Sequence, residues 1–149
     1  MPLTRADQRL RRRARARTLQ ALYAWDVAHD GSIAGVTERV WDDTALGREE
    51  RAFATPLIRW VEAHGAEIDG LLADLTTNWR LERLGAIERA ALRLGAAELM
   101  YPGSDERPVT PPVTAIQETV ALTERFGDAE SARFVNGILD ALARRLGRL

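Results

Sequence analysis

The sequence of 149 residues contains no cysteine, which excludes disulfide bonds, thiolate metal ligands and a cysteine nucleophile. It has only two histidines, His29 and His64, which are 35 residues apart. No phosphate-binding loop of the G-x-x-x-x-G-K-[ST] type occurs, and no acidic pair stands out with metal-ligand spacing. His64 falls in an apolar helical stripe, where we expect a packed side chain. We therefore expect no metal, no other cofactor and no catalytic activity.

Long apolar runs are also missing. No stretch approaches the roughly 18 apolar residues that a membrane span requires, and no apolar segment with a cleavage site follows the basic start. We therefore expect a cytoplasmic protein without a secretory signal. At 46% hydrophobic and 29% charged residues, the chain can bury a real core, which excludes disordered and collagen-like proteins. Its length suits one domain, or two small helical halves that share a core.

Lysine is absent as well, so all 21 basic residues are arginine. Residues 5–17 hold seven of these arginines and a single acid, which gives a local charge of +6. The other residues sum to −7, so the formal net charge of −1 conceals a basic segment on an acidic body. This asymmetry indicates a polyanionic partner for the basic segment.

The hydrophobic periodicity is helical almost throughout, and strand-like alternation is nearly absent. The fold class is therefore all-α, with six or seven helices. Thr4 and Asp7 fit a capping box at the start of the first helix. The expected helices cover residues 5–29, 33–41, 48–75 (or 56–75), a short turn at 79–84, 85–101 and 112–126, and a last helix capped by Asp128 or Ser131.

Several residues predict local features of these helices. Thr55 and Pro56 either start a helix or kink a longer one. Gly95 indicates a close helix crossing, because glycine otherwise weakens a helix. Thr110 is the expected N-cap after the loop at 101–112, and Gly127 should end the helix that follows. The inner face of the last helix is expected to comprise Phe134, Ile138, Leu142 and Leu146.

The first helix carries a cationic face. Gln20 and Tyr23 extend this face, Arg11 and Arg15 flank it, and apolar residues occupy the opposite side. The five arginines that share it are Arg5, Arg9, Arg12, Arg13 and Arg17. Like charges one turn apart repel one another, and a phosphate backbone would offset that cost. The alternative is a solvated helix whose arginines pair with the acidic body.

Arginine offers forked hydrogen-bond donors and a flat surface that stacks on bases, and Tyr23 offers a second stacking surface. Single-stranded or irregular RNA is favoured over duplex DNA, because no pair of recognition helices with half-site spacing is evident. The residues alone thus predict an RNA-binding helical module whose arginine face is not neutralised by the protein's own carboxylates.

Four segments together resemble the NusB family of bacterial transcription antitermination factors. They are "RRRARARTLQALYAW" at 11–25, "ERLGAIERAALRLGAAEL" at 82–99, "AIQETVAL" at 115–122 and "RFGDAESARFVNGILD" at 125–140. The resemblance implies seven helices in one domain of two packed halves, at about 1–78 and 79–149. It also implies binding to the boxA element of ribosomal RNA leader transcripts, as a heterodimer with the small-subunit ribosomal protein NusE.

Such a complex would join other Nus factors on RNA polymerase and prevent premature termination, without catalysis. Some relatives are thought to hide their RNA surface by self-association, so a homodimer is an open alternative. Carried over by position, the RNA contacts are Arg11, Arg12, Arg13, Arg15, Gln20 and Tyr23, with a second patch of Phe126, Arg133 and Phe134. The acidic positions that would meet the ribosomal protein are Glu82 and Glu88.

Parts of this assignment have plainer alternatives. Phe134 is as much a core candidate as an RNA contact, and Asn136 and Gly137 are expected to serve backbone hydrogen bonding and close packing rather than a ligand. The chain also departs from the family pattern at residues 117–119 and 123–124, which removes one positive charge beside the RNA surface, and its 101–110 loop is long.

Two other functions compete with antitermination. The same domain resembles the amino-terminal RNA-binding part of a ribosomal RNA cytosine methyltransferase. Such an enzyme needs a Rossmann-like domain for its methyl donor and a cysteine nucleophile, and this sequence has neither. The other is a helical scaffold whose arginines dock an acidic protein.

Overall fold

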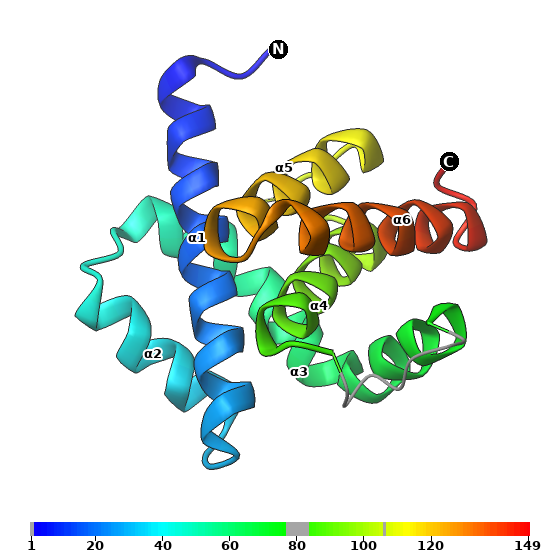
Figure 1. The fold of residues 1–149 in the computed structure, drawn as a ribbon. Helices are drawn as coiled ribbons and strands as arrows, with labels where there is room; N and C mark the ends of the chain where they lie inside the picture. Colours follow the sequence, from blue (N-terminus) through cyan, green and yellow to red (C-terminus); the bar gives the residue numbers. More distant parts are fainter. Residues whose placement is uncertain (1, 77–83, 106) are drawn as a thin grey trace.

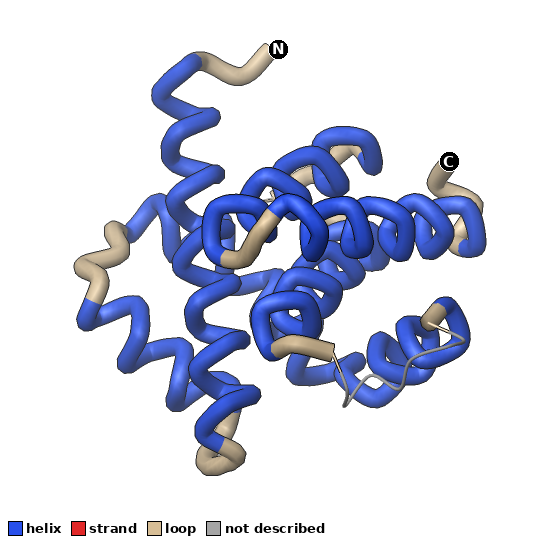
Figure 2. Tube along the Cα trace, viewed as in Figure 1, coloured by secondary structure: helices blue, strands red, loops and turns tan. Residues whose placement is uncertain are grey.

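The computed structural model describes residues 2–76, 84–105 and 107–149. Within them the chain forms helices and connecting loops only (Figure 2). These helices are α1 (Arg5–Ala28), α2 (Ile33–Asp43), α3 (Arg48–Leu75), α4 (Ala86–Met100), α5 (Pro112–Phe126) and α6 (Ala129–Arg145). The predicted all-α class is confirmed. The expected turn at 79–84 and the boundary between the two halves fall largely outside the described residues.

Helix α4 lies at the centre of the molecule and packs against α1, α3, α5 and α6 (Figure 1). Every residue from Ala90 to Leu99 is buried, as expected for a helix that is covered on all sides. The hydrophobic core is built around α4 and includes side chains from all six of these helices. Gly95 faces Leu139 of α6 so closely that an added Cβ would lie 2.6 Å from Leu139 Cδ1. The predicted close crossing is confirmed.

Local signals place most helix ends correctly. The Thr4 hydroxyl accepts from the Asp7 amide at 3.0 Å, and the Asp7 carboxylate accepts from the Thr4 amide at 3.1 Å. Asp128, not Ser131, caps α6 by accepting from the Ser131 amide at 2.7 Å. The N-cap of α5 is Pro111. Thr110 does not have its expected capping role, because its hydroxyl lies 3.4 Å from the buried Glu98 carboxylate.

The alternatives at Pro56 are resolved in favour of the longer helix. Helix α3 passes through Pro56 without interruption, and its backbone leaves helical dihedrals only at His64, where φ is −121° and ψ is 19°. Thr55 does not act as an N-cap, since its hydroxyl donates to the Arg51 carbonyl at 2.7 Å. That hydrogen bond lies within the same helix, one turn back.

The buried face of α6 is rotated from the predicted one. Of the four expected residues only Leu142 is fully buried, and the other three are half-buried at the edge of the core. The fully buried side chains are Val135, Leu139, Leu142 and Ala143. Asn136 and Gly137 are exposed, and a Cβ at Gly137 would meet no atom within 4 Å. The expectation of close packing at Gly137 is therefore wrong.

An ion-pair network joins the second half of α1 to α4 and α3. Asp26 accepts from Arg89 at 2.6 Å and from Arg93 at 2.9 Å, and Arg93 also donates to Asp69 at 3.0 Å. Burial raises the pKa of Asp26, but the hydrogen bonds and charges of the two arginines outweigh it and hold the pKa below its usual value.

This network predicts a loss of stability in acid. A carboxylate with a depressed pKa stabilises the folded state above its unfolded pKa of about 4, and that contribution disappears as pH falls through the lower folded pKa. Asp26→Asn should therefore be less stable than wild type at pH 7, and the difference should shrink from about pH 4 downward. Urea unfolding across this range measures it. A difference that stays constant with pH would contradict the assignment.

Candidate nucleic-acid interface

The first turns of α1 carry two uncompensated cations. Arg5 and Arg9 are exposed, and neither forms an ion pair or hydrogen bond with another side chain in the described part of the chain. In Figure 1 this end of α1 extends beyond the ends of the other helices. The two guanidinium groups are therefore open to an anion.

Arg12 and Arg13 are exposed but paired with carboxylates. Arg12 Nε lies 3.2 Å from Glu118 of α5, and Arg13 Nε lies 2.9 Å from Glu50 of α3. The arginine side chains nevertheless remain 60% and 43% exposed. The prediction of an arginine face without ion pairs is thus wrong for these two residues. The partner carboxylates are only 20% and 16% exposed, but each pair is open to solvent on the arginine side, so a phosphate can compete for the guanidinium groups.

Arg15 lies in the interior and not on the predicted surface. Its side chain is 3% exposed, and its Nε donates to Glu98 at 2.9 Å. This position flanks the cationic face, and the rest of the protein packs against that flank. The expectation that Arg15 meets RNA is therefore dropped, because its guanidinium group is enclosed and already bonded.

The partner of Arg15 is the centre of a buried charge cluster that the sequence analysis did not find. Glu98 is fully buried on α4 and also accepts from Arg107 Nη2 at 2.6 Å. Arg107 Nε donates to the Phe53 carbonyl at 2.9 Å. Burial lowers the pKa of Arg107, and the Glu98 carboxylate partly offsets this effect. The cluster ties the 101–111 loop to α1, α3 and α4. The only sequence signal was one acid within an apolar stretch.

A groove follows α1 on the side of α5. It has a volume of about 600 Å³, and it brings the start of α1 against the loop and the first turns of α5. Its polar lining residues are Gln8, Arg11, Arg12, Arg15, Thr110, Thr114, Gln117 and Glu118, with the nearly buried Arg15 and Thr110 at its floor. The Arg11 guanidinium lies over the Phe53 ring at 5.0 Å. Amides and guanidinium groups beside an exposed arginine face are groups that contact both phosphates and base edges.

The second predicted patch lies at the turn between α5 and α6. Arg133 is exposed, whereas Phe126 and Phe134 are half-buried and pack against the core. The Arg12–Glu118 pair fixes the register of α1 against α5, so the last turn of α5 lies beside the middle of α1. The structure therefore brings this patch close to the arginine face.

The remaining predicted residues lie farther along the molecule. Gln20 is half-buried and accepts from Arg17 at 2.8 Å. Tyr23 is 39% exposed, and Val27 is exposed one turn later. Tyr23 lies about 15 Å along the helix axis from Arg13, next to the Asp26 network. Glu88 is half-buried and accepts from the Gly85 amide at 3.0 Å, which caps α4. Glu82 lies outside the described residues.

The sequence profile of the NusB family matches residues 12–144. The chain belongs to the NusB family. The transcription antitermination protein NusB of Sorangium cellulosum is 39% identical over 135 residues, covering 91% of this chain and 92% of that protein. The protein of the same name from Myxococcus xanthus is 40% identical over 142 residues, covering 93% and 97%.

Solved structures agree with this assignment to the NusB family. A crystal structure of the antitermination factors NusB and NusE in complex with double-stranded RNA matches with a TM-score of 0.79 and 29% identity, covering 92% of this chain and 98% of that one. T. maritima NusB matches with a TM-score of 0.80 and 30% identity, covering 90% of each chain.

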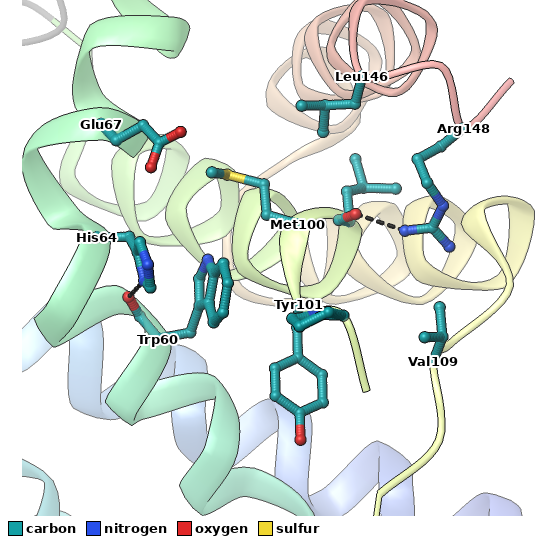
Figure 3. Close-up of a pocket in the computed structure, with 10 residues that line it drawn as sticks. Trp60, His64, Glu67, Met100, Tyr101, Val109, Leu146 and Arg148 are labelled. Atoms are coloured by element: carbon teal, nitrogen blue, oxygen red, sulfur yellow. Dashed lines mark hydrogen bonds between the residues drawn. The ribbon is translucent and has the colours of Figure 1, made fainter. Parts of the chain in front are cut away.

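This NusB-family chain also has a cavity of about 530 Å³ beside the end of α4 (Figure 3). His64 stacks on Trp60 with 3.8 Å between ring centroids, and its Nδ1 lies 3.3 Å from the Trp60 carbonyl. The predicted packed histidine is confirmed. Among the described residues, no three acidic or histidine side chains gather as a metal site, and no helix is long and apolar enough to cross a membrane.

Proposed function

We propose that this protein is a cytoplasmic transcription antitermination factor. It binds boxA-type RNA of ribosomal RNA leader transcripts together with the small-subunit ribosomal protein NusE. The complex then joins other Nus factors on RNA polymerase and prevents premature termination. One observation supports this above all: the chain aligns along most of its length with NusB antitermination proteins.

The RNA surface in this proposal is the arginine face of α1 together with the α5–α6 turn. Arg5 and Arg9 bind phosphates directly, and Arg12 and Arg13 exchange their carboxylates for phosphates. Arg133 extends the same positive surface, and the exposed edges of the two half-buried aromatic rings lie beside it. The RNA contacts kept from the sequence analysis are Arg11, Arg12, Arg13, Gln20, Tyr23, Phe126, Arg133 and Phe134.

The proposed protein-binding surface surrounds the start of α4. Glu88 lies there, and the Asp26–Arg89 pair holds the second half of α1 beside it. A basic ribosomal protein suits the acidic body of the chain, which carries a charge of −7 outside residues 5–17. Tyr23 and Val27 add exposed apolar area of the kind that protein interfaces use. Tyr23 thus lies where the two proposed surfaces meet.

Titration of fluorescent boxA-type RNA with this protein, in the presence and absence of NusE, tests the function. We expect weak binding by the protein alone and much tighter binding with NusE. Glu88→Arg should weaken capture of NusE by about tenfold or more, because it places a cation against a basic partner. Binding of RNA in the absence of NusE should change by less than about twofold, because Glu88 lies on α4 and is none of the proposed RNA contacts.

Glu88→Gln is the matched control, because an amide can keep the capping hydrogen bond to Gly85 while removing the charge. It should weaken NusE capture less than Glu88→Arg and leave the melting temperature unchanged. A parallel loss of RNA binding and NusE binding would show that the two surfaces are not separate. Complete failure to bind RNA, with or without NusE, would favour the scaffold alternative.

The RNA in the titration should include a duplex, since one structural neighbour was crystallised with double-stranded RNA. We expect higher affinity for single-stranded RNA than for the duplex, because the stacking groups at the α5–α6 turn need unpaired bases. Equal affinity for single-stranded and double-stranded RNA would mean that the protein recognises phosphates and no unpaired bases.

A further inference from the structure

One arginine outside the family's RNA-contacting positions lies at the junction of the two RNA patches. Arg125 is exposed in the last turn of α5, and its Cζ lies 4.9 Å from the centroid of the neighbouring Phe126 ring. The Arg12–Glu118 pair sets the register of α5 against α1. Arg125 lies two turns farther along α5 and Arg17 just over one turn beyond Arg12 on α1, and the two charges are close enough for Arg125 to act on Arg17.

The guanidinium group of Arg17 has few partners in the described structure. Its Nη1 donates to Gln20 Oε1 at 2.8 Å, but its buried Nε has no acceptor among the described residues. Neither Arg17 nor Arg125 forms an ion pair with a described acid. The carboxylate nearby, that of Glu50, is already paired with Arg13.

The surroundings of Arg17 are electrostatically unfavourable in the free protein. Burial lowers the pKa of Arg17, and the positive charges of Arg13 and Arg125 lower it further, against a smaller opposing effect of Glu50. Adjacent like charges of this kind cost stability. A bound anion would relieve the repulsion between Arg17 and its cationic neighbours, and the free energy gained in this way would add to the affinity for the anion.

We propose that Arg17 and Arg125 bind one RNA phosphate between them, and that Arg125 joins the arginine face of α1 to the α5–α6 patch. This inference rests on the proposed function and assigns two residues, Arg17 and Arg125, that the family resemblance did not. The phosphate belongs to RNA because the pair continues the line of Arg9 and Arg13 along α1. The Phe126 ring lies under the Arg125 guanidinium and supports it at this position.

The test compares Arg17→Ala, Arg125→Ala and the double variant in binding to single-stranded boxA-type RNA, measured by fluorescence anisotropy. Each single change should lower affinity about tenfold, as expected for the loss of a charge-assisted hydrogen bond. Because both side chains hold the same phosphate, the double variant should lose little more than either single variant. A loss of about a hundredfold would mean two separate contacts and would overturn the proposal.

Stability of the free protein separates a binding role from a structural one. Arg125→Ala removes a charge that repels Arg17, so its melting temperature should stay within about 2 °C of wild type while RNA affinity falls. Arg39→Ala is the control, because Arg39 is exposed on α2 and forms no ion pair with a described residue; it should change RNA affinity less than about twofold.

Unchanged RNA affinity in Arg125→Ala would overturn this inference and leave the proposed function intact. Absence of RNA binding by the wild-type protein would instead remove the proposed function itself. A large fall in the melting temperature of Arg125→Ala would assign Arg125 a structural role and would equally overturn the proposal.

Discussion

Glu98→Ala is expected to lower the free energy of unfolding by about 3–5 kcal/mol. Its carboxylate is fully buried and accepts hydrogen bonds from both Arg15 and Arg107. Without it, two guanidinium groups remain in the interior beside each other with no compensating charge. The cost of an uncompensated buried charge greatly exceeds the net contribution of the intact pair.

The effect should be structural and should spread beyond α4. Arg107 anchors the 101–111 loop, and Arg15 anchors the middle of α1, so both segments lose their attachment to the core. We expect a fall in the midpoint of urea unfolding and faster hydrogen exchange in the loop. Glu118→Ala is the matched control, because it removes a carboxylate from an exposed arginine and should cost less than about 1 kcal/mol. Equal losses in the free energy of unfolding for the two variants would show that the buried Glu98 cluster stabilises the fold no more than an exposed ion pair does.

Replacing both Arg12 and Arg13 with alanine should lower RNA affinity by about a hundredfold, or roughly tenfold for each lost phosphate contact. The fold should survive, because the two arginine side chains are 60% and 43% exposed and each ion pair is open to solvent on the arginine side. Anisotropy titrations and circular dichroism measure the two quantities separately. A loss of helical signal would show that these arginines are structural.

The chain offers a closely matched control for this variant. Arg144 and Arg145 are adjacent, exposed, and paired with Asp140 and Asp74 at 2.9 and 3.2 Å. Replacing both with alanine removes the same charge and the same number of ion pairs from the far end of α6. Its RNA affinity should stay within about threefold of wild type. Equal losses in both double variants would indicate a general effect of net charge and no defined surface.

Helix caps and other local features depend on residues that are close together in the sequence, so the sequence alone predicts them well. The capping box of Thr4 and Asp7 was correct because both partners lie within one turn of helix. Gly95 correctly predicts a close helix crossing, because glycine within a helix has few other uses. The sequence around Pro56 allows both a new helix and a continuous one, since the choice depends on packing that no local pattern records.

The candidate site was predicted less completely because it depends on contacts between distant segments. A helical projection placed Arg15 at the flank of the cationic face, but it did not show that α4 would present Glu98 to that flank. The pairing of Arg12 with Glu118 crosses 106 positions of sequence and was equally invisible. Charge arithmetic identified the basic helix, and the structure decides which of its arginines remain available.

Salt dependence of RNA binding shows whether the arginine face of α1 engages phosphates. With about five arginines neutralising phosphates on a single strand, log K against log salt should have a slope near −3.5, from about 0.7 per contact. The variant lacking Arg12 and Arg13 should have a slope near −2. A wild-type slope close to zero, or one that the double substitution leaves unchanged, would contradict the account.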